Sequence, residues 1–229
     1  MRLAIMQPYL FPYAGYFRLV GAVDRFVFYD DVNFIKGGWI NRNRLFLAGD
    51  IRYFTIPLDN PSPFRKIGDI DVAPRERWRH AMRESIRHAY GKAPRYAAAM
   101  GIFDEATATG GIAQVARRSV MLTCEYLGLR PAFVESSAIY ANQDLNGPDR
   151  VIDICRREGA DVYINAPGGK ALYDPAQFAA VGIDLRFVSG APPAYSRGSQ
   201  PPVPGLSILD MLMFHSPDEI RPLLAEPHA

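Results

Sequence analysis

Residues 2–31 read RLAIMQPYLFPYAGYFRLVGAVDRFVFYDD, and this stretch decides the fold. Its apolar start, residues 2–6, must end at Gln7, because Pro8 moves the residue before it away from the α region. Residues 15–23 carry apolar side chains at helical spacing, and residues 25–29 are aromatic and β-branched enough for a second buried strand. The segment therefore predicts a β-loop-α-β unit.

The rest of the chain repeats this alternation after a longer helical stretch. We predict a hairpin within residues 43–58 that turns at Gly49-Asp50, and a C-cap at Gly128. The predicted helices are residues 74–90, 110–127, 148–157 and 175–180 with two more around Pro217, and the predicted strands are residues 132–135, 161–165 and 184–188. This order predicts a Rossmann-like three-layer α/β sandwich with a mainly parallel sheet and a β-hairpin insertion after the second strand.

Composition sets the class of protein. The 229 residues, 48% hydrophobic and 22% charged, are enough for one α/β domain over residues 1–229. A formal net charge of +2 is too small for the one-sided field that nucleic acid or a membrane surface requires, so neither is an expected partner. No run reaches the ~18 apolar residues of a membrane span, and no basic leader with a cleavage site opens the chain, so a cytoplasmic location is expected.

The two cysteines are predicted to be buried thiols. Cys124 and Cys155 lie in apolar, helix-like segments, with no CxxC spacing and no histidine nearby. No metal site is therefore predicted.

Polar residues follow several of the predicted strands. In open parallel sheets, ligands bind beyond the carboxyl ends of the strands, so these residues are predicted to converge on one cleft. Each taken alone is also compatible with a strand cap or an ordinary half-buried side chain. They are Gln7 and Tyr9 after the first strand, Asp30 and Asp31 after the second, Ser136 and Ser137 after residues 132–135, and Asn165, Gly168, Gly169 and Lys170 after residues 161–165.

The loop that joins the first strand to the first helix is rich in aromatic side chains. Tyr9, Tyr13 and Tyr16 provide ring faces that suit a nucleobase or a sugar, and the helix start offers amide donors to a phosphate or carboxylate. The alternative interpretation is a rigid aromatic loop that closes the edge of the sheet.

The second strand is followed by a concentrated polar segment. A carboxylate near lysine or arginine stays ionised, which suits binding sugar hydroxyls or accepting a proton from an amine. Asp30 and Asp31 are the predicted catalytic residues, and the predicted substrate-binding residues beside them are Lys36, Trp39, Asn41, Arg42 and Asn43. A divalent metal at the acidic pair lacks a spaced third ligand. A solvated hairpin with surface ion pairs is the alternative.

The segment from Asn165 to Lys170 resembles a phosphate cradle in kind, because glycines let backbone amides approach and the lysine adds charge. A plain turn is equally compatible with it. Neither GxxxxGK[ST] nor GxGxxG is present, which argues against a classical ATPase or dinucleotide enzyme. The arginines at positions 75, 79, 83 and 87 fit a solvated helix face better than an anion path, and His215 fits capping or packing as well as catalysis.

Two motifs carry a family resemblance. MQPYLFPYAGYF followed by DDVNFIKGGWINRNRL resembles the opening of the WbqC-like proteins, and YINAPGGKALYD, GIDLRF and LSILDMLMF extend the resemblance nearly to the end of the chain. That family is associated with bacterial O-antigen and other surface-polysaccharide gene clusters. The characteristic residues that the resemblance implies are Gln7, Pro8, Tyr9, Pro12, Gly15, Tyr16, Asp31, Trp39, Asn41, Arg42, Asn43, Gly169, Tyr173, Ser207 and Asp210.

The resemblance implies a transferase that attaches an acyl or aminoacyl group to the amine of a nucleotide-linked sugar. Asp30 or Asp31 would take the proton from the amine, and Arg42 and Lys170 would hold anionic groups. Acyl-CoA or another activated acyl donor would supply the group. Two alternatives stay open: a nucleotidyltransferase-like enzyme that activates a small carboxylic acid with ATP and Mg²⁺, and a non-catalytic module that binds sugar nucleotides. The sequence leaves the sugar, the donor and the oligomeric state open.

Overall fold

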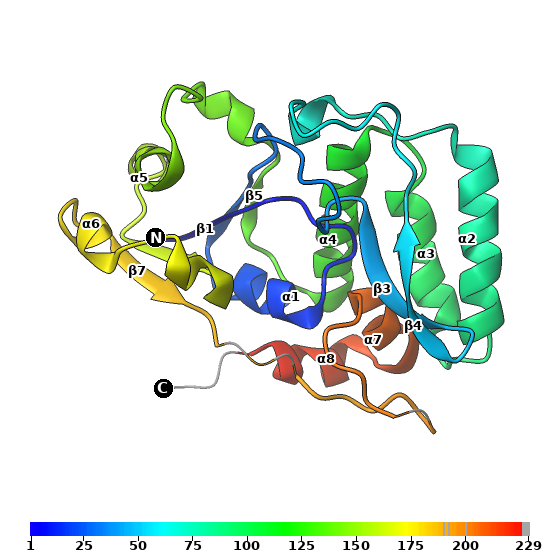
Figure 1. Cartoon of the computed structure of the whole chain (residues 1–229). Helices are drawn as coiled ribbons and strands as arrows, with labels where there is room; N and C mark the ends of the chain where they lie inside the picture. Colours follow the sequence, from blue (N-terminus) through cyan, green and yellow to red (C-terminus); the bar gives the residue numbers. More distant parts are fainter. Residues whose placement is uncertain (190, 192, 200, 226–229) are drawn as a thin grey trace.

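The computed structural model describes residues 1–189, 191, 193–199 and 201–225 (Figure 1). Its centre is a five-stranded sheet in the order β5-β2-β1-β6-β7, in which every neighbouring pair is parallel. The predicted strands are confirmed to within a residue at either end: β1 (Arg2–Met6), β2 (Arg25–Phe28), β5 (Ala132–Val134), β6 (Val162–Asn165) and β7 (Asp184–Phe187).

Alternating side chains of these strands build two cores, one on each face of the sheet. Leu3 and Ile5 of β1 belong to one core, whereas Ala4 between them belongs to the other. The core around Ala4 is covered by α1 (Ala14–Gly21) and α4 (Ile112–Leu127), and the opposite core by α5 (Gly147–Arg157) and α6 (Pro175–Ala179). The predicted three-layer α/β sandwich is confirmed.

The predicted hairpin is also confirmed, as a separate two-stranded antiparallel sheet of β3 (Arg42–Leu47) and β4 (Asp50–Thr55). It turns one residue earlier than predicted, at Ala48 and Gly49, whose φ angles are 52° and 80°. Two positive φ angles in a two-residue loop match the right-handed twist of the flanking strands.

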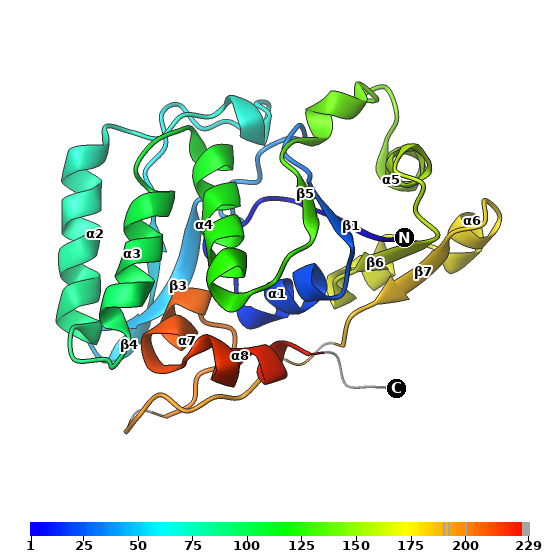
Figure 2. The ribbon, with the colours of Figure 1, turned by 180° about the vertical axis from the view of Figure 1, so that it is seen from behind.

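Three helices stand side by side next to the sheet, and two shorter ones lie across their end (Figure 2). The three are α2 (Arg75–Tyr90), α3 (Tyr96–Ala106) and α4, and the shorter pair is α7 (Ile208–Phe214) and α8 (Pro217–Leu224). α3 was not predicted from the sequence. This helix packs against both α4 and α7, so its sequence, YAAAMGIFDEA, carries only a faint amphipathic pattern.

The arginine row of α2 is largely bound by neighbouring residues. Arg79 donates to the backbone oxygen of Asp104 in α3 at 2.9 Å, and Arg83 forms an ion pair with the Asp104 carboxylate. Arg87 pairs with Glu84 one turn earlier on the same helix. The interpretation as a solvated face therefore fits Arg87, but Arg79 and Arg83 connect α2 to α3.

The Pro-rich segment of residues 190–205, of which positions 190, 192 and 200 lie outside the described residues, is anchored at Arg197. Arg197 is 2% exposed and pairs at 2.8 Å with Asp210 of α7, which is fully buried. The hydroxyls of Tyr90 and Tyr195 donate to the same carboxylate at 2.6 and 2.9 Å. Buried charges need this degree of pairing, so the segment is fixed to α7 at this point.

The loop after β1 runs through the protein interior. Leu10 and Phe11 are fully buried, and Phe11 has a φ of 40°. The Asn43 amide donates to both of their carbonyl oxygens at 2.9 Å, and the Ser207 hydroxyl donates to the Phe11 oxygen at 2.8 Å. The Phe11 N–H donates to the hydroxyl of Ser119 at 2.8 Å. Buried backbone groups require such partners, and here β3, α4 and the start of α7 supply them.

Replacing Asn43 by alanine should destabilise the protein by about 2–4 kcal/mol, because the Leu10 oxygen loses its donor in the interior. Asn41→Ala is the matched control. The Asn41 amide makes one hydrogen bond, to the oxygen of Ile56, so its removal should cost only about 1 kcal/mol. Urea unfolding followed by circular dichroism measures both. Equal losses in the two variants would contradict the anchoring role of Asn43.

Candidate functional site

A cavity of about 760 Å³ opens at the carboxyl ends of β1 and β6. β1 and β6 are neighbours at the centre of the sheet. On one side of this pair the strands continue from β1 through β2 to β5, and on the other side from β6 to β7. The loop after β1 therefore leads to α1 on one face, whereas the loop after β6 leads through η3 (Pro167–Ala171) to α6 on the opposite face. Diverging loops leave a crevice at such a switch point, which is where ligands bind in open α/β sheets.

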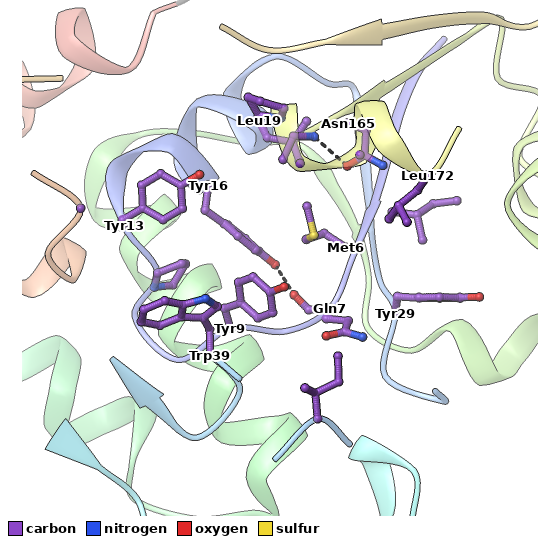
Figure 3. A pocket seen from close by; sticks show the side chains of 18 of the residues that line it. Met6, Gln7, Tyr9, Tyr13, Tyr16, Leu19, Tyr29, Trp39, Asn165 and Leu172 are labelled. Carbon is purple, nitrogen blue, oxygen red and sulfur yellow. Dashed lines mark hydrogen bonds between the residues drawn. The ribbon is translucent and has the colours of Figure 1, made fainter. Parts of the chain in front are cut away.

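Aromatic side chains line two sides of the cavity. Figure 3 shows Tyr9, Tyr13, Tyr16 and Trp39 on one side and Tyr29 with Leu172 on the other. Between them lie Met6 and Gln7 at the end of β1. Aromatic faces with amide groups between them suit a ring that carries hydrogen-bonding substituents.

The phenols of the wall are neutral hydrogen-bonding groups. Burial raises the pKa of Tyr9 and Tyr13, and it raises that of Tyr16 well above the ordinary value. The Tyr16 hydroxyl donates to the backbone oxygen of Gln7 at 2.9 Å, which fixes the loop against α1. At neutral pH these phenols keep their protons, so Tyr9 and Tyr13 can donate hydrogen bonds and none of the three acts as a base.

Two glycines permit close packing around the cavity. A Cβ atom on Gly15 would lie 2.3 Å from Cε2 of Tyr13, so the Tyr13 ring can lie over Gly15 only because that side chain is absent. A Cβ on Gly169 would lie 2.9 Å from Cγ of Asn165. Asn165 is held in turn by the Ala166 N–H, which donates to its Oδ1 at 2.6 Å.

The structure places many of the predicted binding residues on the cavity wall and several elsewhere. Those on the wall are Gln7, Tyr9, Tyr13, Tyr16, Trp39, Asn43, Asn165, Gly168, Gly169 and Tyr173. Those away from it are Asp30, Asp31, Lys36, Asn41, Arg42 and Lys170. The predicted convergence thus brings together the residues directly after β1 and β6, and leaves out Asp30 and Asp31 after β2 and the two serines after β5.

Asp30 and Asp31 form a second, buried cluster with the residues that follow β5. Asp30 accepts from Ser136 Oγ at 2.6 Å and from Arg117 at 2.9 Å. Asp31 accepts from the Ser137 hydroxyl and pairs with Arg150. β2 and β5 are neighbours in the sheet, so the polar residues beyond them meet each other.

The two carboxyl groups have pKa shifts of opposite sign. Burial raises the pKa of Asp30, and the Ser136 hydroxyl and Arg117 offset this only in part. Burial also opposes ionisation of Asp31, but the hydrogen bonds from Ser137 and Arg150 outweigh it and lower the pKa. Arg150 also lies 4.8 Å from the ring centroid of Tyr29, so this cluster supports one wall of the cavity from behind.

The Arg42 side chain is held by the turn before β3 and by the neighbouring strand β4. Its Nε donates to the oxygen of Gly38 at 3.2 Å, and its guanidinium lies 4.4 Å from the ring centroid of Tyr53. Lys170 is exposed, with its ammonium 5.8 Å from the ring centroid of Phe187. Neither side chain lines the cavity.

The one charged side chain among the described residues that line the cavity, Arg44, was not predicted from the sequence. No local pattern distinguishes it, because Arg44 shares one face of β3 with Arg42, which does not line the cavity. Tyr29 was also missed. It is the residue after β2 and points toward the cavity, whereas Asp30 and Asp31 beyond it point to the buried cluster.

Other reactive groups have structural surroundings. No group of three or more His, Cys, Asp or Glu side chains in the described part of the chain is arranged to hold a metal ion. Cys124 and Cys155 are buried as predicted, and burial raises the pKa of Cys155 to about 12. The His215 ring contacts the oxygen of Ser196 at 2.7 Å, which fits packing at the end of α7. No helix within the described ranges is long and apolar enough to span a bilayer.

The parallel sheet, the helices on both faces and the cavity at the switch point define a Rossmann-like α/β protein with a candidate small-molecule site. Within this class the chain belongs to the WbqC-like protein family, whose model matches residues 7–222. The match includes the loop after β1, the hairpin and α7, which together build and support the cavity.

One similar protein is the uncharacterized protein Rv1507c of Mycobacterium tuberculosis. It is 27% identical over 229 residues, which cover 96% of this chain and 97% of the relative. No solved structure matches the chain.

Gly169→Ala should destabilise the protein by about 1–3 kcal/mol, because the new methyl group must push Asn165 out of place. For a protein of this size, each kcal/mol lowers the melting temperature by about 2–4 °C. Gly168→Ala is the matched control, since nothing lies within 4 Å of a Cβ atom there. Thermal unfolding measures both variants, and a larger loss in the Gly168 variant would contradict this packing.

The stability contributions of Asp30 and Asp31 should change with pH in opposite directions. The lowered pKa of Asp31 stabilises the folded state above the ordinary value of 3.8, and this contribution is lost as the pH falls through the folded-state value. The advantage of the parent over Asp31→Asn should therefore shrink toward about pH 3.

Asp30 has a raised pKa, so its contribution is present at low pH and is lost as the pH rises through the folded-state value. The parent should accordingly lose stability relative to Asp30→Asn between about pH 3 and pH 7. Urea unfolding across this range measures both differences. Parallel pH dependences in the two variants would overturn the assignment.

Proposed function

We propose that this protein is a transferase that binds a nucleotide-linked amino sugar in the cavity and modifies it during the synthesis of a bacterial surface polysaccharide. The observation that carries the proposal is the combination of aromatic walls and amide groups at the switch point of the sheet. Rings of sugars and nucleobases bind against aromatic faces, and their hydroxyl and amide groups pair with side chains such as Gln7 and Asn165. Family membership supports the sugar as the substrate class.

The proposed reaction is N-acyl or aminoacyl transfer. The sugar amine attacks the carbonyl carbon of an activated acyl group, a C–N bond forms, and the bond to the leaving group breaks. Neutral phenols and the Gln7 amide would donate hydrogen bonds to the carbonyl oxygen as negative charge develops on it. With a thioester donor, the departing thiolate takes the proton that the amine gives up.

Asp30 and Asp31 fit a supporting role in this proposal better than that of the base predicted from sequence. Both Asp31 oxygens already accept hydrogen bonds, from Ser137 on one and from Gln143 and Arg150 on the other. Through Arg150, which packs on Tyr29, Asp31 would hold one wall of the cavity in place.

A non-catalytic sugar-nucleotide-binding module is the second candidate. The observation that favours it is the absence of a carboxylate or imidazole among the described residues that line the cavity. The two candidates share the ligand and differ in turnover. Incubation with an amino-sugar nucleotide and acyl-CoA, followed by mass spectrometry, separates them, because only the transferase yields the acylated sugar.

Calorimetric titration with sugar nucleotides should detect binding that weakens about tenfold or more in Trp39→Ala, because a stacking face of the cavity is removed. Phe64→Ala is the control, since this side chain is 90% exposed and does not line the cavity. Parallel titrations with acyl-CoA and with ATP and Mg²⁺ test the donors. Binding of ATP and Mg²⁺ without any sugar nucleotide would favour the nucleotidyltransferase-like alternative.

A further inference from the structure

Arg44 is a partly buried arginine without a carboxylate partner among the described residues, in contrast to three other arginines. Arg117, Arg150 and Arg197 each form an ion pair with a buried aspartate. Arg44 forms no ion pair with any described residue. Its NH2 group donates to the backbone oxygen of Gly205 at 3.0 Å, and its guanidinium lies 5.5 Å from the ring centroid of Trp39.

One donor of this guanidinium is left without an acceptor. The Nε atom of Arg44 is buried and makes no hydrogen bond within the described part of the chain. A buried N–H group without a partner is rare and unfavourable in proteins, and the penalty is larger when the group is charged. The side chain is held in this position by Gly205 and lines the cavity, so an acceptor supplied by a ligand would remove the penalty.

The surroundings of Arg44 restrict what that acceptor is. Among the described residues that line the cavity, no other side chain is charged, and the rest are aromatic, aliphatic, amide or glycine. An uncompensated guanidinium in a mainly apolar cavity favours a negatively charged oxygen group, which pairs with its planar fork of donors. Trp39, 37% exposed, lies beside this guanidinium on the cavity wall.

We infer that Arg44 is the anion-binding residue of the cavity, and that the ligand places a phosphate or carboxylate group against its guanidinium between Trp39 and Gly205. The inference deepens the proposed function and rests on it only for the source of the anion. In a nucleotide-linked sugar the group is a phosphate, whereas in an acid substrate or donor it is a carboxylate.

The test is calorimetric titration of the parent protein and of Arg44→Gln with four probes. Inorganic phosphate and acetate represent the two anions, UDP-N-acetylglucosamine represents the sugar nucleotides, and N-acetylglucosamine is its uncharged part. The parent should bind phosphate or acetate, and it should bind UDP-N-acetylglucosamine more tightly than N-acetylglucosamine. Arg44→Gln should weaken binding of the charged probes about tenfold or more and leave N-acetylglucosamine unchanged.

Two further variants make the result specific to this guanidinium. Arg52→Gln removes one positive charge from an exposed position on β4 that does not line the cavity, and it should bind every probe as the parent does. Arg44→Lys keeps the charge but loses the planar fork, so it should retain only part of the affinity for the anions. It also provides the measurement if Arg44→Gln does not fold.

The outcomes separate this inference from the proposed function. Equal affinity of the parent and both Arg44 variants for UDP-N-acetylglucosamine would overturn the inference and leave the proposed function standing. Binding of phosphate or acetate through Arg44, without binding of any sugar nucleotide, would support the inference and contradict the proposed function. A parent protein that binds none of the charged probes would overturn the inference. If only the binding of acetate depends on Arg44, the inference is supported, and the anionic group of the ligand is a carboxylate.

Discussion

The carbonyl oxygens of Leu10 and Phe11 lie in the interior of the protein, where water cannot reach them, and both depend on the amide of Asn43. Loops usually run over the surface because their backbone groups need water. This one is buried because β3, α4 and the residue before α7 supply the missing partners. The aromatic wall of the cavity depends on that arrangement, since the same loop carries Tyr9 and Tyr13.

The strand order explains why two polar clusters form where a single cleft was predicted. β2 and β5 lie on one side of β1, whereas β6 and β7 lie on the other. The residues after β1 and β6 therefore meet at the switch point and line an open cavity, whereas the two aspartates after β2 meet the serines after β5 in a buried network. Arg150 connects the two by packing on Tyr29, so the buried network supports the wall of the cavity.

Most strands and helices were predictable because each carries its own local signal. β1 is an apolar run that ends before Pro8, the hairpin alternates around its turn at Gly49, and α4 ends before Gly128, its C-cap, where φ is 73°. α3 was not predicted, because a helix packed against several neighbours has no clear polar face. The candidate site was predictable in its tyrosines and amides but not in Arg44, whose role depends on its neighbours in space.

The sequence by itself determined the alternation of strands and helices, the aromatic loop after β1 and the family to which the chain belongs. These are local patterns, and local backbone preferences and hydrophobic periodicity are sufficient to produce them. Only the tertiary structure decided which polar residues face the cavity and which are buried in pairs. That choice depends on strand order and on where each charge finds a partner, as Asp31 does in Arg150 and Arg44 does not among the described residues.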